Sequence, residues 1–436
     1  LLLPAIAETT MHTTHADSAP AEASRPPARW HDQPWVWVLA GGVIMGLALG
    51  VRHAGGMFQL PMTLDHQWSR EVFGFAIAVQ NLVWGLAQPF TGMLADRFGA
   101  RRVIVPGLLL YALGLAGMRL AATPLELTLS AGLCIGIALS GTSFGVVYGA
   151  LSRMVAPSRR GWALGVAGAL GGLGQFAMVP LVQGLIDQLS WSGALLALAL
   201  CCALALPLAW PLRDALPDDG RHTGPEHSLR TALREAFQHR GFWLLSLGFF
   251  ACGFQLAFIA LHLPAYLLGK GLSGNAAVVG LALIALSNVL GTYCCGWLGG
   301  MFRRTYLLAA IYVLRAGVMA LFFMLPLSHT SLYLFCLAMG FVWLGTVPLT
   351  NGVIAQIFGV KYLTTLFGFV FFGHQLGAFF GVWLGGYLYD TTRSYDLVWL
   401  VGIGLGGVAA LLHWPINDQP ASRPATLSLR PCTSTK

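Results

Sequence analysis

A single arginine lies in the middle of the first long apolar stretch of the chain, within Gly50–Pro61 (GVRHAGGMFQLP). One such charge at the centre of a membrane helix costs roughly 2.5 to 3.5 kcal/mol, so Arg52 should face protein or water and not lipid. A guanidinium group can bind a carboxylate through two parallel hydrogen bonds. Arg52 is therefore the first candidate for binding an anionic ligand, and the alternative is a structural partner inside the protein.

The same stretch returns 203 positions later as Gly253–Pro264 (GFQLAFIALHLP). In this second copy Gln255 takes the place of Arg52, and His262 takes the place of Gln59. Residues seven apart share one face of an α-helix, so each pair is expected to point the same way. We therefore expect all four side chains to bind substrate between two related halves of the chain.

The distribution of acidic residues favours an anionic substrate. None of the 17 Asp and Glu residues lies well inside an apolar stretch, whereas a carrier of organic cations normally needs a buried carboxylate. Proton coupling would then use the carboxylate of the substrate itself or a histidine, whose ordinary pKa is about 6.5. The histidine candidates are His53, His262 and His374, and a plain packing role is the alternative for each.

The composition places the chain in a membrane. Hydrophobic residues make up 56% and charged residues only 10% of the 436 residues, whereas a soluble protein carries about 25% charged residues. The eight cysteines fit neither a zinc pattern nor a disulfide framework. We expect no metal, no cofactor and, because no nucleophile–base pair is visible, no enzymatic activity. The net charge of +8 is explained by membrane topology and does not indicate nucleic acid.

Apolar stretches long enough to cross about 30 Å of hydrocarbon occur twelve times, in two groups of six separated by a polar loop. We therefore expect an all-α membrane protein with 12 transmembrane helices in two six-helix bundles. The expected spans are 34–62, 71–95, 103–121, 125–151, 161–186, 191–211, 242–268, 274–300, 305–325, 331–357, 363–388 and 395–415.

This pattern divides the chain into five parts. The first, 1–33, is rich in Pro, Ala, Ser and Thr and is expected to be a disordered cytoplasmic tail, within which Met11 is a candidate start of translation. The parts that follow are an N-terminal bundle at 34–211, a cytoplasmic linker loop at 212–240 with an amphipathic run at 229–237, a C-terminal bundle at 241–416 and a cytoplasmic tail at 417–436.

The basic residues predict the orientation in the membrane. With both termini in the cytoplasm, most of the 25 Lys and Arg residues fall in cytoplasmic loops or tails. Such an excess on short loops sets topology, so we expect an inner-membrane protein with cytoplasmic termini. Two arginines, Arg52 and Arg315, remain inside spans. Arg315 lies on the ninth span, where a structural role or snorkelling towards the membrane surface is expected. The residues that would face outward are Arg70, Arg119, Lys270 and Arg393.

The repeat extends beyond the first helix of each half. Ser158–Asp187 aligns with Lys361–Asp390 at the same offset, and Gly141-Thr142 matches Gly345-Thr346 at an offset of one more. Two six-helix halves in parallel repeat are the plan of secondary transporters that rock around a site at the membrane midplane.

The loop after the second span, Gly92–Arg102 (GMLADRFGARR), resembles the cytoplasmic loop motif of the major facilitator superfamily. Its glycines allow a tight turn and close helix approach, and Asp96 can accept a bond from an arginine or from the backbone at a neighbouring helix end. A plain basic loop would explain the arginines but not Asp96. The second half carries a decayed copy, Gly296–Arg304, which lacks the aspartate. The resemblance implies a conformational role for Gly92, Asp96, Arg97, Gly99 and Arg101.

Within that superfamily the chain is similar, over about 34–416, to the monocarboxylate porter family. Ser158–Gly168 (SRRGWALGVAG) looks like the basic-then-glycine motif of this family, and Gly50–Met62 resembles the first helix of its bacterial members, which include oxalate–formate antiporters. In that resemblance Arg52 falls where animal members carry a membrane-embedded lysine implicated in anion and proton handling.

Two departures from the animal members matter. Asp32-Gln33-Pro34 replaces their Asp/Glu-Gly motif before the first helix, and their aspartate–arginine pair of the eighth helix falls on Asn288 and Thr292. If this chain binds anions, Arg52 must take the place of that arginine. The substrate-binding candidates are accordingly Arg52, Gln59, Gln255, His262, Asn288 and His374.

Taken together, these patterns predict a secondary transporter that moves a small, monocarboxylate-like organic anion together with protons by alternating access. The expected partners are that anion, protons and the lipid bilayer, with neither nucleic acid nor an obligate protein partner. The first alternative is an efflux pump for amphipathic compounds, in which Arg52 is structural. A non-transporting sensor is disfavoured because the central loop is too short for a signalling domain. In the efflux-pump alternative, the aromatic residues that could line the cavity are Trp84, Trp297, Trp343, Phe371 and Phe372.

Overall fold

The computed structural model describes residues 33–68, 70–213 and 228–420. Throughout these ranges the regular structure is helical, which confirms the expected all-α class. The predictions about the tail at 1–32, Met11, the central part of the linker and the residues beyond 420 lie outside the described residues.

The first half crosses the membrane six times. Its crossings are built from α1 (Pro34–Ala54), η2 (Gly55–Phe58) and α2 (Gln59–Asp65); α3 (Arg70–Phe98); α4 (Arg101–Leu120); α5 (Pro124–Leu127), η3 (Thr128–Cys134), α6 (Ile135–Thr142) and α7 (Phe144–Met154); and α8 (Arg160–Leu204), with the short turns η4 (Pro157–Arg159) and η5 (Leu206–Ala209) at its ends.

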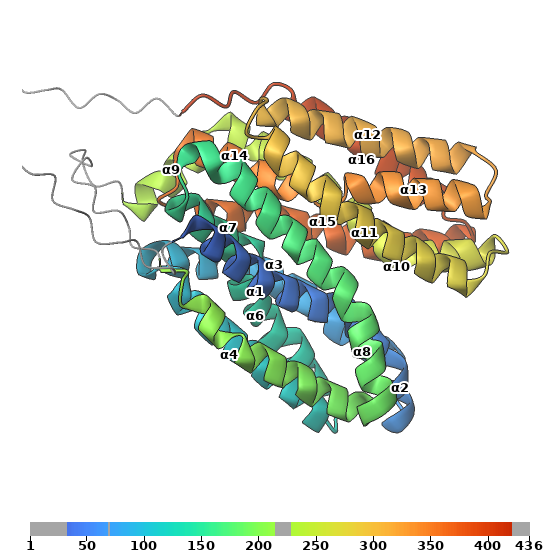
Figure 1. The fold of residues 1–436 in the computed structure, drawn as a ribbon. Helices are drawn as coiled ribbons and strands as arrows, with labels where there is room; N and C mark the ends of the chain where they lie inside the picture. Colours follow the sequence, from blue (N-terminus) through green and yellow to red (C-terminus); the bar gives the residue numbers. More distant parts are fainter. Residues whose placement is uncertain (1–32, 69, 214–227, 421–436) are drawn as a thin grey trace, which may run out of the picture.

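Helix α8 supplies two of these crossings. A straight helix of its 45 residues would be about 67 Å long, more than twice the hydrocarbon thickness. Ser190 interrupts it with a positive φ of 61°, and the chain turns back there, as Figure 1 shows. Within the described residues, 11 helical stretches are long and apolar enough to span a membrane, and the one at Pro157–Ala209 contains this turn. The fold therefore has the twelve expected crossings.

The second half repeats the plan. It consists of α10 (Arg240–Gly269), α11 (Gly274–Leu298), α12 (Arg304–Met324), α13 (His329–Phe341) with α14 (Thr346–Phe358), α15 (Leu363–Thr392) and α16 (Asp396–His413), preceded by the short helix α9 (Leu229–Gln238). The fourth crossing breaks at Ser143, and the tenth breaks at the corresponding place between α13 and α14.

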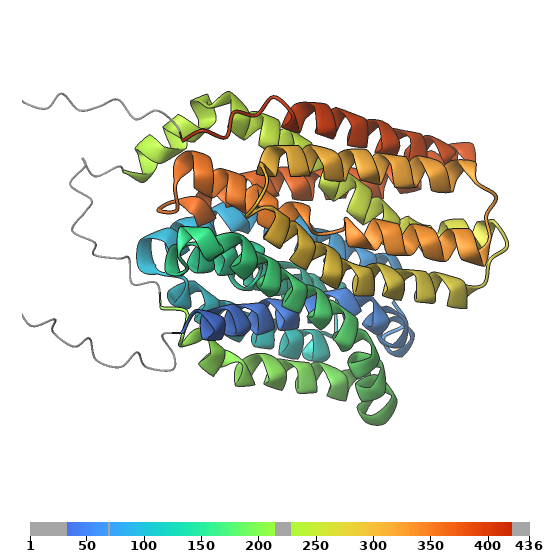
Figure 2. The ribbon, with the colours of Figure 1, turned by 45° about the horizontal axis from the view of Figure 1, so that its top comes forward.

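The two bundles lie side by side (Figures 1 and 2) and meet mainly where α3 packs on α15 and where α8 packs on α11. Both contacts need glycine. A Cβ atom at Gly92 would lie 2.6 Å from the carbonyl oxygen of Thr364, and one at Gly161 would lie 2.5 Å from that of Gly296. These approaches lie at the end of the molecule that carries α9 and the start of α1, which we call the α9 end (Figure 1). The halves are therefore in contact there.

The first crossing is not one continuous helix. A 3₁₀ turn at Gly55–Phe58 separates α1 from α2. Because a 3₁₀ helix has 3.0 residues per turn in place of 3.6, the turn rotates Gln59 relative to Arg52. The two side chains therefore do not have the register of one continuous α-helix, whereas Gln255 and His262 lie on the uninterrupted α10.

Candidate functional site

Arg52 lies in the last turn of α1, midway along the first crossing. Its Nη2 donates a hydrogen bond to Oδ1 of Asn81 on α3, and its guanidinium carbon lies 5.0 Å from the centre of the Trp84 ring. Its Nε is buried and has no hydrogen-bond partner in the described part of the chain. A guanidinium offers five N–H donors, so this group retains capacity for a ligand.

Asn81 connects Arg52 to the other half of the protein. Its Nδ2 donates to the carbonyl of Ile77 at 3.0 Å, which directs Oδ1 towards the guanidinium. Its own main-chain carbonyl accepts a bond of 3.2 Å from Nε2 of Gln375 on α15. Sequence reasoning missed Asn81 as a site residue. The available signal was an amide inside an apolar span, directly after Gln80.

His374, one of the predicted residues, belongs to the same group. Its Nδ1 lies 3.2 Å from Oε1 of Gln375, and its ring stacks on Phe371 with centroids 5.3 Å apart. Phe371 in turn contacts Trp84, with centroids 5.0 Å apart. A continuous path of polar and aromatic side chains therefore runs from Arg52 in the first half to His374 in the second.

The structure does not bring Gln255 to Arg52. Gln255 is fully buried, and its Nε2 donates to the carbonyl of Gly402 on α16 at 2.9 Å. His262, near the other end of α10, is half-buried and places Nε2 2.9 Å from the carbonyl of Val382 on α15. Equivalent positions of the repeat thus have different surroundings, because α1 contacts α3 at Arg52 while α10 turns this face to α15 and α16.

Asn288 and His53 have other environments. Oδ1 of Asn288 accepts bonds from the backbone N–H of Leu344 at 3.0 Å and from Oγ1 of Thr292 at 2.9 Å, so it holds α11 against the start of α14. His53 is exposed next to Arg52, and Gln59 is half-buried beyond the 3₁₀ turn.

The second arginine within a span, Arg315 on α12, is fully buried. Its Nε and Nη2 donate to the carbonyl of Val342 at 2.9 and 2.6 Å, Nη2 also donates to that of Trp343, and Nη1 contacts Sγ of Cys252 at 3.1 Å. These carbonyls end the first part of the broken tenth crossing, where a cation is favourable. Arg315 therefore has a structural role, and the alternative of snorkelling is wrong.

The aspartate of the loop motif forms a polar lock between the halves at the α9 end. Asp96 is buried at the end of α3, and its Oδ1 lies 2.6 Å from Nη1 of Arg153 on α7. Its Oδ2 accepts bonds of 2.7 Å from both the backbone N–H and the hydroxyl of Thr365, and Oδ1 accepts from the N–H of Thr364 at 3.3 Å. Thr364 and Thr365 lie in the first turn of α15, where the backbone N–H groups have no partner within the helix.

The other motif residues form the turn after α3 and pack on nearby aromatic rings. Gly99 has a positive φ of 89°, which favours glycine at the turn after α3. Arg97 and Arg101 lie over aromatic rings, 5.1 Å from the centre of Phe98 and 4.6 Å from that of Trp210. The arginine that pairs with Asp96 is Arg153, which the sequence motif did not single out.

The aromatic residues of the alternative prediction do not gather in one place. Trp84 and Phe371 are in contact, with Nε1 of Trp84 donating to Gln88 Oε1 and Ser143 Oγ at 3.1 Å each. Trp297, in contrast, is 50% exposed near the end of α11. Among the described residues there is no group of three or more His, Cys, Asp or Glu side chains that could hold a metal ion.

Two repeated six-crossing bundles, with a partly buried cation near their contact and a polar lock at one end, define the architecture of a secondary transporter. The family model of the Major Facilitator Superfamily matches residues 38–353, and the chain belongs to this superfamily. It is a multi-pass membrane transporter and not an enzyme.

Relatives and solved structures agree with this assignment. Monocarboxylate transporter 13 of Bos taurus is 28% identical over 413 residues, which cover 90% of this chain and 92% of the relative. The uncharacterized MFS-type transporter YcxA of Bacillus subtilis (strain 168) is 24% identical over 389 residues, covering 83% of this chain and 90% of the relative. The E. coli fucose:proton symporter FucP has the same fold, with a TM-score of 0.65 at 19% identity, covering 86% of this chain and 97% of that one.

Proposed function

We propose that this transporter carries a small, monocarboxylate-like organic anion by alternating access, with Arg52 binding the carboxylate. The observation that carries the proposal is the state of the Arg52 guanidinium. It is bonded to a neutral amide, its Nε has no partner, and within the described residues it forms no ion pair. A carboxylate can use such a group through two charge-assisted bonds. The similarity to a protein named as a monocarboxylate transporter supports the same substrate class.

The surrounding side chains then have definite roles. Asn81 orients the guanidinium, and Trp84 provides the aromatic face on which it lies. Gln375 and His374, from the second half, offer polar groups to the rest of the substrate. The packing of Gln255, His262 and Asn288 against other helices leaves them outside this proposed site.

Proton coupling is part of the proposal. His374 is the histidine whose contacts lead to Arg52, through Phe371 and Trp84. A proton on His374 would place a positive charge in the half opposite Arg52 and so favour the anion-loaded state. His53, adjacent to Arg52, and His262 are the other candidates, and uptake by H374Q, H53Q and H262Q under an imposed proton gradient distinguishes the three.

The Asp96 lock supplies the conformational element. In the described structure the halves are joined at the α9 end by the bonds of Asp96 to Arg153, Thr364 and Thr365. Rocking the halves apart at this end breaks the bonds to α15 and opens the site to that side. We propose that the α9 end faces the cytoplasm, which places both termini there in an inner-membrane orientation.

The test combines ligand stabilisation with transport. Purified protein and R52Q are screened for thermal stability against mono- and dicarboxylates, and the stabilising compounds are then assayed in proteoliposomes. A ligand at about 100 times its dissociation constant adds roughly 2.7 kcal/mol to the native state. The matched control is R119Q, which removes an exposed arginine of the same half that bonds to Ser192.

We expect at least one carboxylate to stabilise the native protein and R119Q but not R52Q. Stabilisation by neutral or cationic amphiphiles, with no response to any carboxylate, would contradict the anion proposal and favour the efflux alternative.

A further inference from the structure

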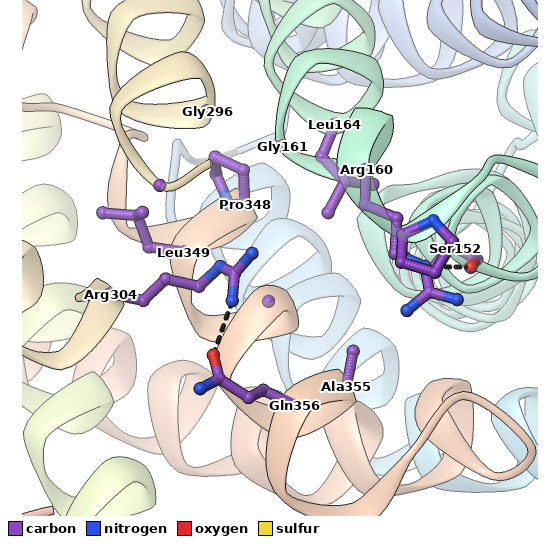
Figure 3. A pocket seen from close by; sticks show the side chains of 13 residues that line it. Ser152, Arg160, Gly161, Leu164, Gly296, Arg304, Pro348, Leu349, Ala355 and Gln356 are labelled. Atoms are coloured by element: carbon purple, nitrogen blue, oxygen red, sulfur yellow. Dashed lines mark hydrogen bonds between the residues drawn. The ribbon is translucent and has the colours of Figure 1, made fainter. Parts of the chain in front are cut away.

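A cavity lined by arginines from both halves lies at the α9 end, away from Arg52. Its volume is about 170 Å³, and it lies among the start of α8, the end of α11 and helix α14 (Figure 3). A cavity of this size has room for an oxyanion and water. Its lining includes Arg160 and Gly161 from the first half and Gly296, Arg304 and Gln356 from the second.

Two arginines from opposite halves face this cavity. Nε of Arg160 donates to the carbonyl of Ser152 at 2.7 Å, and Nη1 of Arg304 donates to Oε1 of Gln356 at 2.6 Å (Figure 3). Both partners are neutral, and the two guanidinium charges act on each other. The nearby carboxylate of Asp418 influences Arg304, but its hydrogen bond of 3.0 Å goes to a different arginine, Arg303.

The repeat shows what this cavity lacks. In the first lock, Asp96 binds Arg153 and the backbone N–H groups of Thr364 and Thr365. At the offset of 203, Thr364 and Thr365 correspond to Gly161 and Trp162, and Gly161 lines the cavity. At the offset of 204 that aligns the fourth and tenth crossings, Arg153 corresponds to Ile357, next to the cavity residue Gln356. In the decayed copy of the loop motif, the position of the aspartate is taken by Gly300.

The cavity therefore lies at the counterpart of the Asp96 lock. The start of a helix is present there and the carboxylate is missing, and the cations Arg160 and Arg304 come from other positions of the repeat than Arg153. Backbone N–H groups at the start of α8 favour an anion, as do guanidinium groups.

We propose that this cavity binds a small oxyanion, a phosphate or carboxylate group, which bridges Arg160 and Arg304 and completes the second lock. Because the two arginines belong to different halves, an anion bound to both has higher affinity for the state in which the α9 end is closed. It therefore shifts the equilibrium towards that state. This consequence for the cycle rests on the proposed alternating access, whereas binding of the anion does not.

The first experiment uses inorganic phosphate as the probe on the full-length protein in detergent, at constant ionic strength. We expect phosphate to raise the melting temperature in a saturable way, with chloride as the reference salt. R160Q and R304Q should each weaken the apparent phosphate affinity about tenfold or more. R159Q, which removes the exposed neighbouring arginine, should respond like the native protein. Equal stabilisation of R160Q and R304Q, or no response of the native protein to either phosphate or an anionic lipid, would overturn the proposal.

A second variant tests the proposal without removing an arginine. A Cβ atom at Gly300 would meet only the carbonyl oxygen of Trp297, at 3.2 Å, so a side chain at this position requires a backbone shift of a few tenths of an ångström. G300D restores the missing carboxylate and should raise the melting temperature while abolishing the phosphate response. G300N has the same size without the charge and should keep that response. Identical behaviour of the two variants would contradict an anion site here.

Two further arms distinguish the source of the anion and the dependence on Arg52. Protein in nanodiscs with phosphatidylglycerol is compared with protein in phosphatidylcholine nanodiscs. Stabilisation by phosphatidylglycerol through Arg160 and Arg304, without an effect of free phosphate, assigns the oxyanion to a lipid headgroup. R52Q should retain the phosphate response in full. If carboxylate transport does not depend on Arg52, the proposed oxyanion site at Arg160 and Arg304 is unaffected. If no anion acts through Arg160 and Arg304, the proposed transport of a carboxylate bound by Arg52 is unaffected.

Discussion

Arg52 and Arg315 are both arginines within apolar spans, but their surroundings differ. Arg315 is fully buried and bonded to two main-chain carbonyls and a thiol at the break of the tenth crossing. Arg52 is bonded to one side-chain amide, lies on an indole ring and keeps a buried Nε without a described partner. The first has its desolvation cost offset by the protein. The second requires a partner from outside to offset it in full.

The largest effect is expected when the structural arginine is removed. R315Q leaves the carbonyls of Val342 and Trp343 without their donor, which should reduce the free energy of unfolding by roughly 2 to 5 kcal/mol. Thermal or denaturant unfolding measures this loss, and the fraction that remains folded should bind substrate with native affinity. A fully stable R315Q with impaired substrate binding would contradict the assigned role.

R52Q should show the opposite behaviour. Its stability without ligand should remain close to the native value, because Asn81 can bond to the introduced amide. Carboxylate uptake into proteoliposomes should fall about 100-fold, as expected when one partner of a desolvated charge pair is truncated. R52K provides a graded control, since a lysine keeps the charge but not the two parallel bonds. Native uptake by R52Q would show that Arg52 is structural.

A substitution at Asn81 can give Arg52 a carboxylate partner within the protein. N81D places a carboxylate on the guanidinium with almost no change in shape, so it competes directly with the substrate. We expect the apparent affinity for carboxylates to fall about tenfold or more, while the fold remains stable. N81S, a neutral control, should have a smaller effect. Unchanged affinity in N81D would indicate that the substrate does not approach this side of Arg52.

The smallest effect is expected from the lock. D96N keeps the size of the side chain but removes its charge at Arg153 and at the start of α15. The equilibrium should shift towards opening of the α9 end by about 1 kcal/mol, with Arg52 unaffected. Distances between spin labels at positions 97 and 361 report this shift. An unchanged distance distribution would contradict the conformational role of Asp96.

Several features could be predicted because they depend on local sequence. Membrane thickness and hydrophobic runs determine the twelve crossings, which the structure confirms even where α8 continues through Ser190. The asymmetry between the two loop motifs is visible in the sequence itself, as Asp96 in one copy and Gly300 in the other. The roles assigned to Arg97 and Arg101 in gating remain predictions.

Other features could not be predicted because they depend on how helices rotate against one another. Helical spacing grouped Arg52 with Gln59, but a single 3₁₀ turn changed the register. The repeat equated Gln255 with Arg52, but Gln255 turns to α16 and bonds to Gly402. Asn81 and Arg153 gained their importance only when packing brought them to Arg52 and Asp96.

The sequence by itself determined the number of crossings, the repeat, the membrane arginines and the lone aspartate of the loop, since each follows from residue type and spacing. Tertiary structure alone decided which arginine is satisfied by backbone and which remains available, because that depends on where helices break and expose their carbonyls. It also brought Arg160 and Arg304 to one cavity. These two arginines lie more than a hundred residues apart in the sequence and meet only because the two halves pack together.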